Sequence, residues 1–478
     1  MNLDQSVDNK NIINLLLNDD INRNRYLTKF LKLITNGGSN QIYSLNGNWG
    51  SGKTIFIKKL ELLINYISSY KDGKKRDYIY SECLKDLDDE DIQNMSSILE
   101  NSEIKECVNM VSQGLINAIY FNAWEHDDEE DPILSLIYEI INEFHLTDKA
   151  EYLNSNKILK NINVIIKNLS LGRLDFSGIN EEADTINRIK RKSNLNETVN
   201  AVLNGLIQEN CNRLIIFIDE LDRCNPKYAV KMLERIKHYF KHDKVIIVIS
   251  TNILELSNTV SALYGKNFSS TKYLDKFFDV RLDLPMVNIE KYMDTIQLKV
   301  AKSQFEWFGV VVNRFVFYKK MDMREINRYL TIIQWFQKTG YKSRTMEFYY
   351  QNSILELLVL PYSIGLYITD ISEYKRFIDG NGFEEFKNFI SNDKSILSLC
   401  KCYLYPQSCK TIDDSKITDD NLLENVKKIY EIMFTKSNTN DFTKVNVGEL
   451  ELTQNNFKNI SDSISLLGAL SDFSSEEQ

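Results

Sequence analysis

The stretch that decides the fold is Gly47-Asn48-Trp49-Gly50-Ser51-Gly52-Lys53-Thr54. It fits the spacing GxxxxGK[ST], follows an apolar run over 42–45 that is typical of a strand, and opens a helical pattern over 54–70. Glycines let backbone N–H groups turn inward, and the N-terminus of the following helix attracts anions. The stretch therefore predicts a phosphate-binding P-loop that binds nucleotide, and the matched context disfavours a plain glycine turn. We expect Lys53 to reach the β- and γ-phosphates and Thr54 to hold Mg²⁺.

A second apolar run, 214–218, ends in two carboxylates, Asp219 and Glu220. A buried strand that delivers acids at its C-terminal end suits the ligand crevice of an open α/β sheet. Asp219 is expected to bind Mg²⁺ directly or through water, and Glu220 to orient or deprotonate the attacking water, with Lys53 completing the catalytic set. Many surface strands end in the same two residues, so the pattern becomes strong only together with the P-loop upstream.

Strands and helices alternate along the first part of the chain, which predicts an α/β fold with a parallel sheet flanked by helices. The expected strands cover 42–45, 116–122, 214–218, 245–250 and 278–284, and the expected helices cover 11–35 (one or two), 54–70, 132–144, 226–240 and 253–264. Two polar segments, about 71–112 and 146–210, are interpreted as helical insertions, and the acidic stretch 81–106 as a solvated one.

The remainder of the chain shows helical periods without a comparable strand signal. Helices are expected at 290–303, 323–338, 353–370 and 421–434. We therefore predict a nucleotide-binding domain over 1–289 and an all-α C-terminal region over 290–478, with an acidic tail that frays.

Composition narrows the function classes. The chain has only 18 glycines and five prolines in 478 residues, which favours long helices and few loops. A net charge of -9 gives no general affinity for nucleic acid or anionic membranes, although a local basic groove is not excluded. The run 354–368 is short and interrupted by Glu356 and Pro361, so we expect a buried helix pair and no stable membrane insertion. The N-terminus lacks a secretory pattern, and a cytoplasmic protein with reduced cysteines is expected.

Four segments together resemble the KAP family of P-loop NTPases. They are GNWGSGKT at 47–54, YFNAWEHDDEEDP at 120–132, IIFIDELDRCNPKYAVKMLERIKHYF at 215–240 and KYLDKFFDVRLDLP at 272–285. The match of order and spacing runs from about residue 8 to 290. The resemblance implies an ATP-binding and ATP-hydrolysing domain of the signalling type, which in bacterial members is linked to phage exclusion or membrane-associated assemblies. Many relatives carry transmembrane helices between the P-loop and the acidic strand, and no such run is present here.

Polar residues after the next strand, and several arginines, are candidates for sensing the γ-phosphate. Asn252 or Thr251 fits a sensor position, and an N-cap of the helix beginning near Ile253 is an equally good interpretation. The family usually has Asp where Asn252 stands. An arginine finger is sought among Arg223, Arg235, Arg281 and Arg324, each of which is more often part of an ion pair. We favour Arg223, and also Arg324, because MREINRYL at 323–330 resembles the family's PRxIKRxxN helix, where a second sensor arginine sits.

The segment after the second strand contributes both packing and polar residues. Phe121 and Trp124 are interpreted as packing residues, because aromatics that close a strand normally fill core. Asn122 and Glu125 are expected at the same sheet edge as the P-loop, within reach of the catalytic water or Thr54. The cysteines Cys400, Cys402 and Cys409 have a poor spacing for zinc.

Two classes of function follow. The first is an ATPase, with ATP and Mg²⁺ as cofactors, that acts as a nucleotide-dependent switch on a protein partner or a second copy of the chain, with anti-phage defence as the setting that the resemblance suggests. The alternative is a nucleotide-stabilised scaffold with little turnover, or a nucleic-acid-activated component of a defence effector. Turnover and nucleotide retention distinguish the first two, and the effect of DNA or RNA tests the third.

Overall fold

The computed structural model describes residues 8–19, 22–37, 41–71, 74–75, 84–129, 131–143, 197–205, 207, 211–240, 242–293, 306–339, 354–406, 417–434, 444–454, 456–458, 460–461 and 464. The chain divides into two compact units, Asp4–Lys291 and Tyr292–Gln478. Most of the expected insertion at 146–210, most of the expected helix at 290–303, nearly all of the tail after 461, and Cys409 lie outside the described residues.

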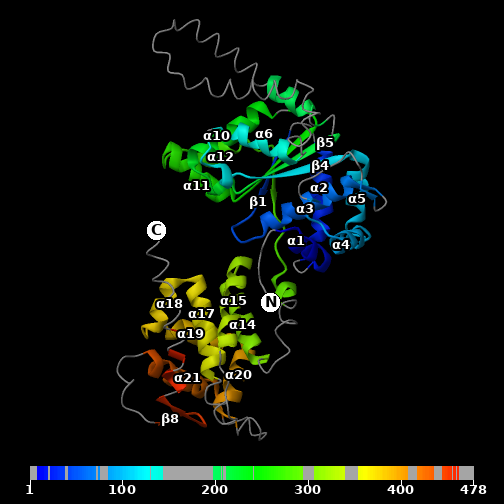
Figure 1. Cartoon of the computed structure of the whole chain (residues 1–478). Helices are drawn as coiled ribbons and strands as arrows, with labels where there is room; N and C mark the ends of the chain where they lie inside the picture. Colours follow the sequence, from blue (N-terminus) through cyan, green and yellow to red (C-terminus); the bar gives the residue numbers. More distant parts are fainter. Residues whose placement is uncertain are drawn as a thin grey trace. The chain divides into compact units, whose positions relative to one another are not determined.

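The first unit is built on a five-stranded sheet with the order β4-β5-β6-β1-β7 (Figure 1). Its strands are β1 (Ile42–Asn46), β4 (Ile116–Asn122), β5 (Arg213–Asp219), β6 (Val245–Thr251) and β7 (Val280–Asp283). Every neighbouring pair is parallel, as expected. The P-loop strand β1 and the acidic strand β5 are separated by β6, so the two motifs meet across the end of an intervening strand.

Helices cover both faces of this sheet, as Figure 1 shows. One face carries α6 (Pro132–Glu143), α10 (Pro226–Tyr239), α11 (Ile253–Tyr264) and α12 (Ser270–Leu274), and the other α1 (Asn9–Asn18), α2 (Asn24–Asn36), α3 (Lys53–Ser69), α4 (Asp89–Leu99) and α5 (Lys105–Gly114). Along β5, Ile216 and Ile218 enter one core and Ile215 and Phe217 the other. Because both of their faces are buried, β5 and β6 are almost continuously apolar, and this is why they are recognisable in the sequence.

The acidic stretch 81–106 is not simply solvated, and that prediction was wrong. Met95 and Ile98 of α4, and Cys107 and Val111 of the following α5, are buried in the core shared with α1 to α3. The acids of this stretch instead serve the start of α4, where Asp88 forms a capping box and negative charge is favoured by the helix dipole.

The free edge of the sheet at β4 is covered by side chains of α3. Asn65 donates to the Ala118 carbonyl oxygen and accepts from the Ala118 N–H, both at 2.8 Å. Glu61 accepts the Tyr120 N–H at 3.0 Å. These helix residues take the place of a further strand, so the helix that begins at the P-loop is fixed against the strand that ends at Asn122.

The second unit is mainly helical. Its helices are α14 (Glu306–Lys319), α15 (Met323–Thr339), a π-helical turn (Leu355–Val359), α17 (Leu360–Thr369), α18 (Ile371–Ile378), α19 (Phe383–Ser391), α20 (Lys394–Leu404) and α21 (Asp419–Phe434). A cluster of aromatic rings packs between them, with Tyr362 in contact with Phe315, Phe377 and Phe386.

One element departs from the all-α expectation for this region. The strands β8 (Lys444–Val447) and β9 (Leu450–Thr453) form an antiparallel hairpin. Each strand is four residues long and half polar, which is too short a pattern to separate from a loop. Gly448, with φ 62°, makes the turn.

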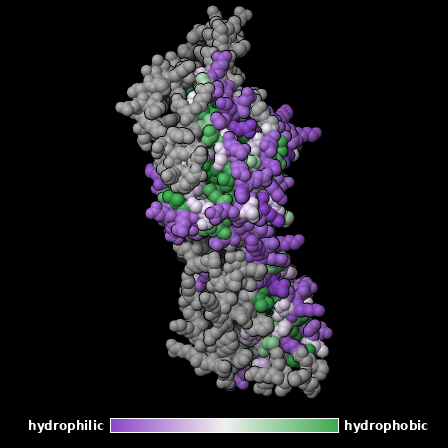
Figure 2. Space-filling model, turned by 90° about the vertical axis from the view of Figure 1, so that its right-hand side faces the viewer, coloured by the Kyte–Doolittle hydropathy of each residue, from purple (hydrophilic) through white to green (hydrophobic). Residues whose placement is uncertain are grey.

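None of the described helices is long and apolar enough to cross a membrane. Among the residues that are coloured in Figure 2, hydrophilic ones predominate and apolar ones form narrow areas between them. Scattered apolar residues of this kind are normal on a protein surface.

Candidate functional site

The P-loop turns tightly from β1 into α3. Gly50 and Gly52 have φ values of 73° and 84°, in the left-handed region that favours glycine. The loop is closed by a hydrogen bond from the Ser51 N–H to the Asn48 carbonyl oxygen at 3.2 Å, and its base is joined to the end of β6, where the Gly47 N–H donates to the Thr251 carbonyl oxygen. The backbone therefore has the tight turn that the glycine spacing predicts.

Lys53 is buried and folds back along its own loop. Its Nζ donates to the carbonyl oxygens of Gly47 at 2.7 Å and Asn48 at 3.2 Å. Burial lowers the pKa of Lys53, while nearby carboxylates, Asp222 foremost, oppose this. The ammonium group is thus held at the mouth of the loop by two carbonyl bonds that it must exchange in order to contact a phosphate.

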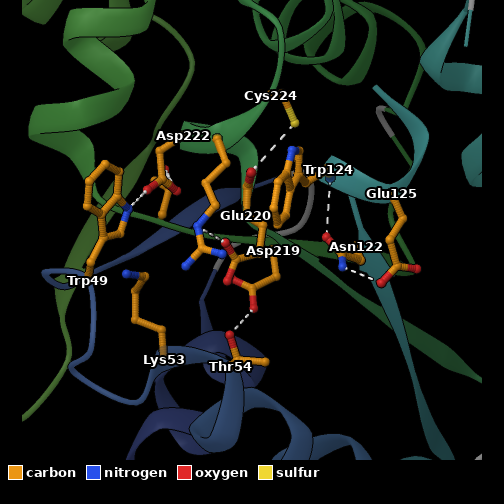
Figure 3. Close-up of polar contacts among 12 residues, drawn as sticks. Trp49, Lys53, Thr54, Asn122, Trp124, Glu125, Asp219, Glu220, Asp222 and Cys224 are labelled. Carbon is orange, nitrogen blue, oxygen red and sulfur yellow. Dashed lines mark hydrogen bonds and ion pairs between the residues drawn. The ribbon is translucent and has the colours of Figure 1, made fainter. Parts of the chain in front are cut away.

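Thr54 and Asp219 come together across the sheet edge, as Figure 3 shows. The Thr54 Oγ1 donates to Asp219 Oδ2 at 2.6 Å. Asp219 is fully buried, and its other oxygen, Oδ1, makes no hydrogen bond of good geometry among the described residues. Burial raises the pKa of Asp219, and Thr54, the nearby Ser250 hydroxyl and the Glu220 backbone N–H oppose this shift. A buried carboxylate oxygen without a partner, beside a hydroxyl, is a donor set that fits Mg²⁺, which prefers hard oxygen ligands.

Glu220 has a strained backbone. Its φ and ψ of 61° and 22° lie in the left-handed region, which costs a non-glycine residue on the order of 1–3 kcal/mol and is typical of functional sites. Its carboxylate pairs with the Arg223 Nε at 2.5 Å, and the Arg223 guanidinium lies 5.4 Å from the centre of the Trp124 ring. Burial and the neighbouring Asp219 raise the pKa of Glu220, which brings the carboxylate closer to the range of a general base.

Asp222 is a connecting residue that the sequence analysis missed. Its two oxygens accept from the Trp49 indole Nε1 at 2.6 Å and from the Thr251 hydroxyl at 3.0 Å. It thereby joins the tip of the P-loop to the short helix Leu221–Arg223 and to the end of β6 (Figure 3). The sequence signal was an acid in the turn after the acidic strand, together with a tryptophan inside the P-loop.

A comparison with protein families identifies the family of this domain. The family model described as KAP family P-loop domain matches residues 23–339. The chain belongs to the KAP family. The KAP domain is thus a P-loop NTPase domain, as the motifs indicated.

Two further comparisons add little to this assignment. No curated protein matches the chain. Among solved structures the chain is similar to the ORC2 protein of Aeropyrum pernix, solved in ADPNP–ADP complexes. The two share 10% sequence identity, 94% of each chain is covered, and the TM-score is 0.30. A likeness at this score carries no argument about the KAP chain.

The other candidate residues of the KAP chain are placed as follows. Asn252 is the N-cap of α11, since its Oδ1 accepts the Leu254 N–H at 3.1 Å. Arg235 and Arg281 form ion pairs with Asp131 and Asp275. Arg324 is exposed in the first turn of α15, in the second unit. Of the three arginines in the first unit, Arg223 is therefore the one that pairs with Glu220.

The segment after β4 has mixed roles. Phe121 is buried and stacks on the His126 ring with centroids 4.9 Å apart, so the packing interpretation is confirmed for it. It was wrong for Trp124, which is 51% exposed and lies beside Arg223. Asn122, the last residue of β4, lies at the expected edge of the sheet. Its side chain donates to the Glu125 carboxylate at 2.6 Å (Figure 3).

No group of three or more His, Cys, Asp or Glu that would hold a metal ion occurs within the described part of the chain. Of the three cysteines considered for zinc, Cys400 is buried and Cys402 half-buried, and Cys409 lies outside the described residues. Thr54 and Asp219 are a donor set of a different kind: they would hold Mg²⁺ only together with oxygens from a nucleotide and water.

Proposed function

We propose that the KAP domain binds ATP with Mg²⁺ and hydrolyses it, acting as a nucleotide-dependent switch. The observation that supports this most directly is the unpartnered buried oxygen of Asp219 beside the Thr54 hydroxyl, at the same sheet edge as the P-loop and Glu220. Such an oxygen is costly to bury without a ligand.

Each residue has a defined part in the proposed reaction. The backbone N–H groups from Gly47 to Thr54 bind phosphate oxygens, and Lys53 neutralises charge on the β- and γ-phosphates. Thr54 and Asp219 would hold Mg²⁺, which when bound neutralises charge as the leaving group departs. Glu220 accepts a proton from water as the water oxygen attacks the γ-phosphorus. The bond from phosphorus to the bridging oxygen breaks, so that ADP and phosphate are the products.

The reaction requires Glu220 to face water. Its ion pair with Arg223 lies half-buried, and the pair must open or rotate before the carboxylate can accept a proton. Once released, the Arg223 guanidinium is available to the γ-phosphate as a finger. A sensor role requires Thr251 to give up its bond to Asp222, or Asn252 to use its amide N–H groups while its oxygen caps α11. These finer roles are part of the proposal.

Phosphate release by purified full-length protein tests the hydrolysis. Lys53→Ala is expected to abolish it, and Glu220→Gln to lower it by about 10²-fold or more while ATP still binds, because general-base catalysis contributes ~10²–10⁴-fold. Matched controls are Lys227→Ala and Glu90→Gln, which change exposed residues of the same types. Turnover that is unchanged in both site variants refutes the proposal.

The two contacts just described also favour a second candidate, a nucleotide-stabilised interaction module with little turnover. Lys53 is bonded to its own loop and Glu220 to Arg223, so the catalytic groups are engaged with the protein. Nucleotide that stays bound through purification, with negligible phosphate release, identifies this function. Rapid release of phosphate excludes it.

We propose anti-phage defence as the setting of the switch, which the family resemblance supports, with a protein partner or a second copy of the chain as the target. Plaque counts on bacteria that express wild-type protein or the Lys53→Ala variant test it, and equal phage resistance in both would contradict a nucleotide-dependent role.

A further inference from the structure

Arg23, immediately before α2, is a buried cation that the proposed chemistry does not use. It is 2% exposed, and its guanidinium faces backbone carbonyls: Nη1 donates to the Ser51 carbonyl oxygen at 2.6 Å, and Nη2 donates to the Pro285 carbonyl oxygen. No carboxylate pairs with it within the described residues, and its Nε lacks a partner there. Burial lowers the pKa of Arg23 to about 10, so it stays charged at neutral pH. A buried charge without a counter-ion is destabilising unless something else requires it.

The backbone around Arg23 is held firmly. The Asp19 carboxylate accepts the N–H groups of Arg23 at 2.8 Å and Asn24 at 3.1 Å. The Asn24 amide donates to the Leu16 carbonyl oxygen at 2.6 Å, and its oxygen accepts from the buried Lys59 of α3 at 3.2 Å. The corner between α1 and α2 is therefore fixed on the helix that follows the P-loop, which fixes where the guanidinium lies.

The Ser51 contact acts on a peptide that belongs to the phosphate cradle. The Ser51 carbonyl and the Gly52 N–H are the two ends of one peptide group, so a cation bonded to the carbonyl polarises the peptide and makes the Gly52 N–H a stronger donor. Gly52, with φ 84°, has no Cβ to restrict how that peptide turns. An external contact is thus needed to keep the peptide in one orientation, and Arg23 supplies it.

The second contact lies near the end of the first unit. Pro285 is the second residue after β7, and only residues 286–291 separate it from Tyr292, where the second unit begins. Met286, the first residue after Pro285, is 94% exposed. One guanidinium therefore touches both the phosphate-binding loop and a residue near the end of the first unit.

We propose that Arg23 is a positioning residue: it holds the Ser51–Gly52 peptide for a phosphate oxygen and links that peptide to Pro285, so that phosphate binding is transmitted to 286–291. This rests on the proposed nucleotide binding. A phosphate on the loop accepts from the Gly52 N–H of the polarised peptide, and the rigid guanidinium passes any shift of the Ser51 carbonyl to Pro285. Lysine cannot replace it, because an ammonium lacks the planar fork that spans two fixed acceptors.

The test uses the full chain with Arg23→Met and Arg23→Lys, and the exposed neighbour change Arg25→Lys as control. Hydrogen exchange is followed over 47–54 and 286–291, without nucleotide and with saturating ADP and Mg²⁺, and Kd for ADP is measured. Without nucleotide, both Arg23 variants are expected to exchange faster over 47–54. With ADP, Arg23→Lys is expected to bind about tenfold more weakly and, at saturation, to be protected over 47–54 but not over 286–291, where wild type and Arg25→Lys are protected.

The outcomes separate this proposal from the proposed function. Unchanged exchange over 47–54 in Arg23→Lys without nucleotide, or ADP protection of 286–291 that persists in it, overturns the positioning role. If wild-type protein binds no ADP, the proposed function fails and transmission fails with it, while the nucleotide-free exchange still decides whether Arg23 positions the loop. If Arg23→Met does not fold, Arg23→Lys, which keeps the charge, carries the test.

Discussion

Replacing Asn65 by leucine tests whether α3 stands in for a missing strand beside β4. Asn65 is buried, and its amide satisfies both the N–H and the carbonyl of Ala118 at 2.8 Å. Leucine has a similar size but bonds neither group. Each buried backbone group left without a partner costs about 1–3 kcal/mol, so Asn65→Leu is expected to destabilise the edge strand by about 2–6 kcal/mol. That is a large part of the ~5–15 kcal/mol that holds a typical domain.

The assay should report on β4 itself, because two units need not unfold in one transition. Hydrogen exchange of the 116–122 segment, measured at increasing urea concentration, gives the free energy of opening for that strand. Asn109→Leu, at an exposed position of α5, is the matched control and is expected to change this value by no more than about 0.5 kcal/mol. A loss below about 1 kcal/mol in Asn65→Leu would show that water or a neighbouring residue satisfies Ala118, and would refute the reasoning.

Three further perturbations follow from single contacts. Because Arg223 lowers the pKa of Glu220, Arg223→Ala should move the acidic limb of the pH–rate profile to higher pH; an unmoved limb contradicts the ion pair. Burial raises the pKa of Glu356 to about 7, so Glu356→Gln should stabilise the second unit by up to about 3 kcal/mol above pH 7, a gain that disappears toward pH 4.5 in thermal melts. A Cβ on Gly365 would lie 2.2 Å from Phe315, so Gly365→Ala should cost about 1–3 kcal/mol, with partial rescue by Phe315→Leu; a rise in Tm refutes this.

The parts of the fold that could be predicted from the sequence are those that depend on interactions between residues close together in the chain. A buried parallel strand is apolar at every position, so β5 and β6 are visible as runs, and Asn225 with Pro226 marks the start of α10 by a cap and a first-turn proline. The P-loop requires glycine where φ is positive, and Gly50 and Gly52 meet that requirement. Local signals of this kind do not depend on the rest of the chain.

The contacts that were missed join residues far apart in the chain. Arg23 lies 28 residues from Ser51 and 262 from Pro285, and Trp49 lies 173 residues from Asp222. A single arginine or aspartate in a polar segment carries no periodicity, so nothing nearby distinguishes it from a solvated residue. These side chains come together only in the folded domain, in which β6 lies between β1 and β5 in the sheet.

The contacts at the same sheet edge support the proposed nucleotide-dependent switch. Lys53 is bonded to the Gly47 and Asn48 carbonyls, and Glu220 is bonded to Arg223. In the proposed reaction a phosphate replaces the carbonyl groups bonded to Lys53, and a water replaces Arg223 beside Glu220. In both cases a bond within the protein is exchanged for a bond to a ligand, and the second exchange takes place at a residue with a strained backbone. A ligand shifts a conformational equilibrium only by its difference in affinity for the two states. Those exchanged bonds are where that difference arises, because each is made in one arrangement and broken in the other.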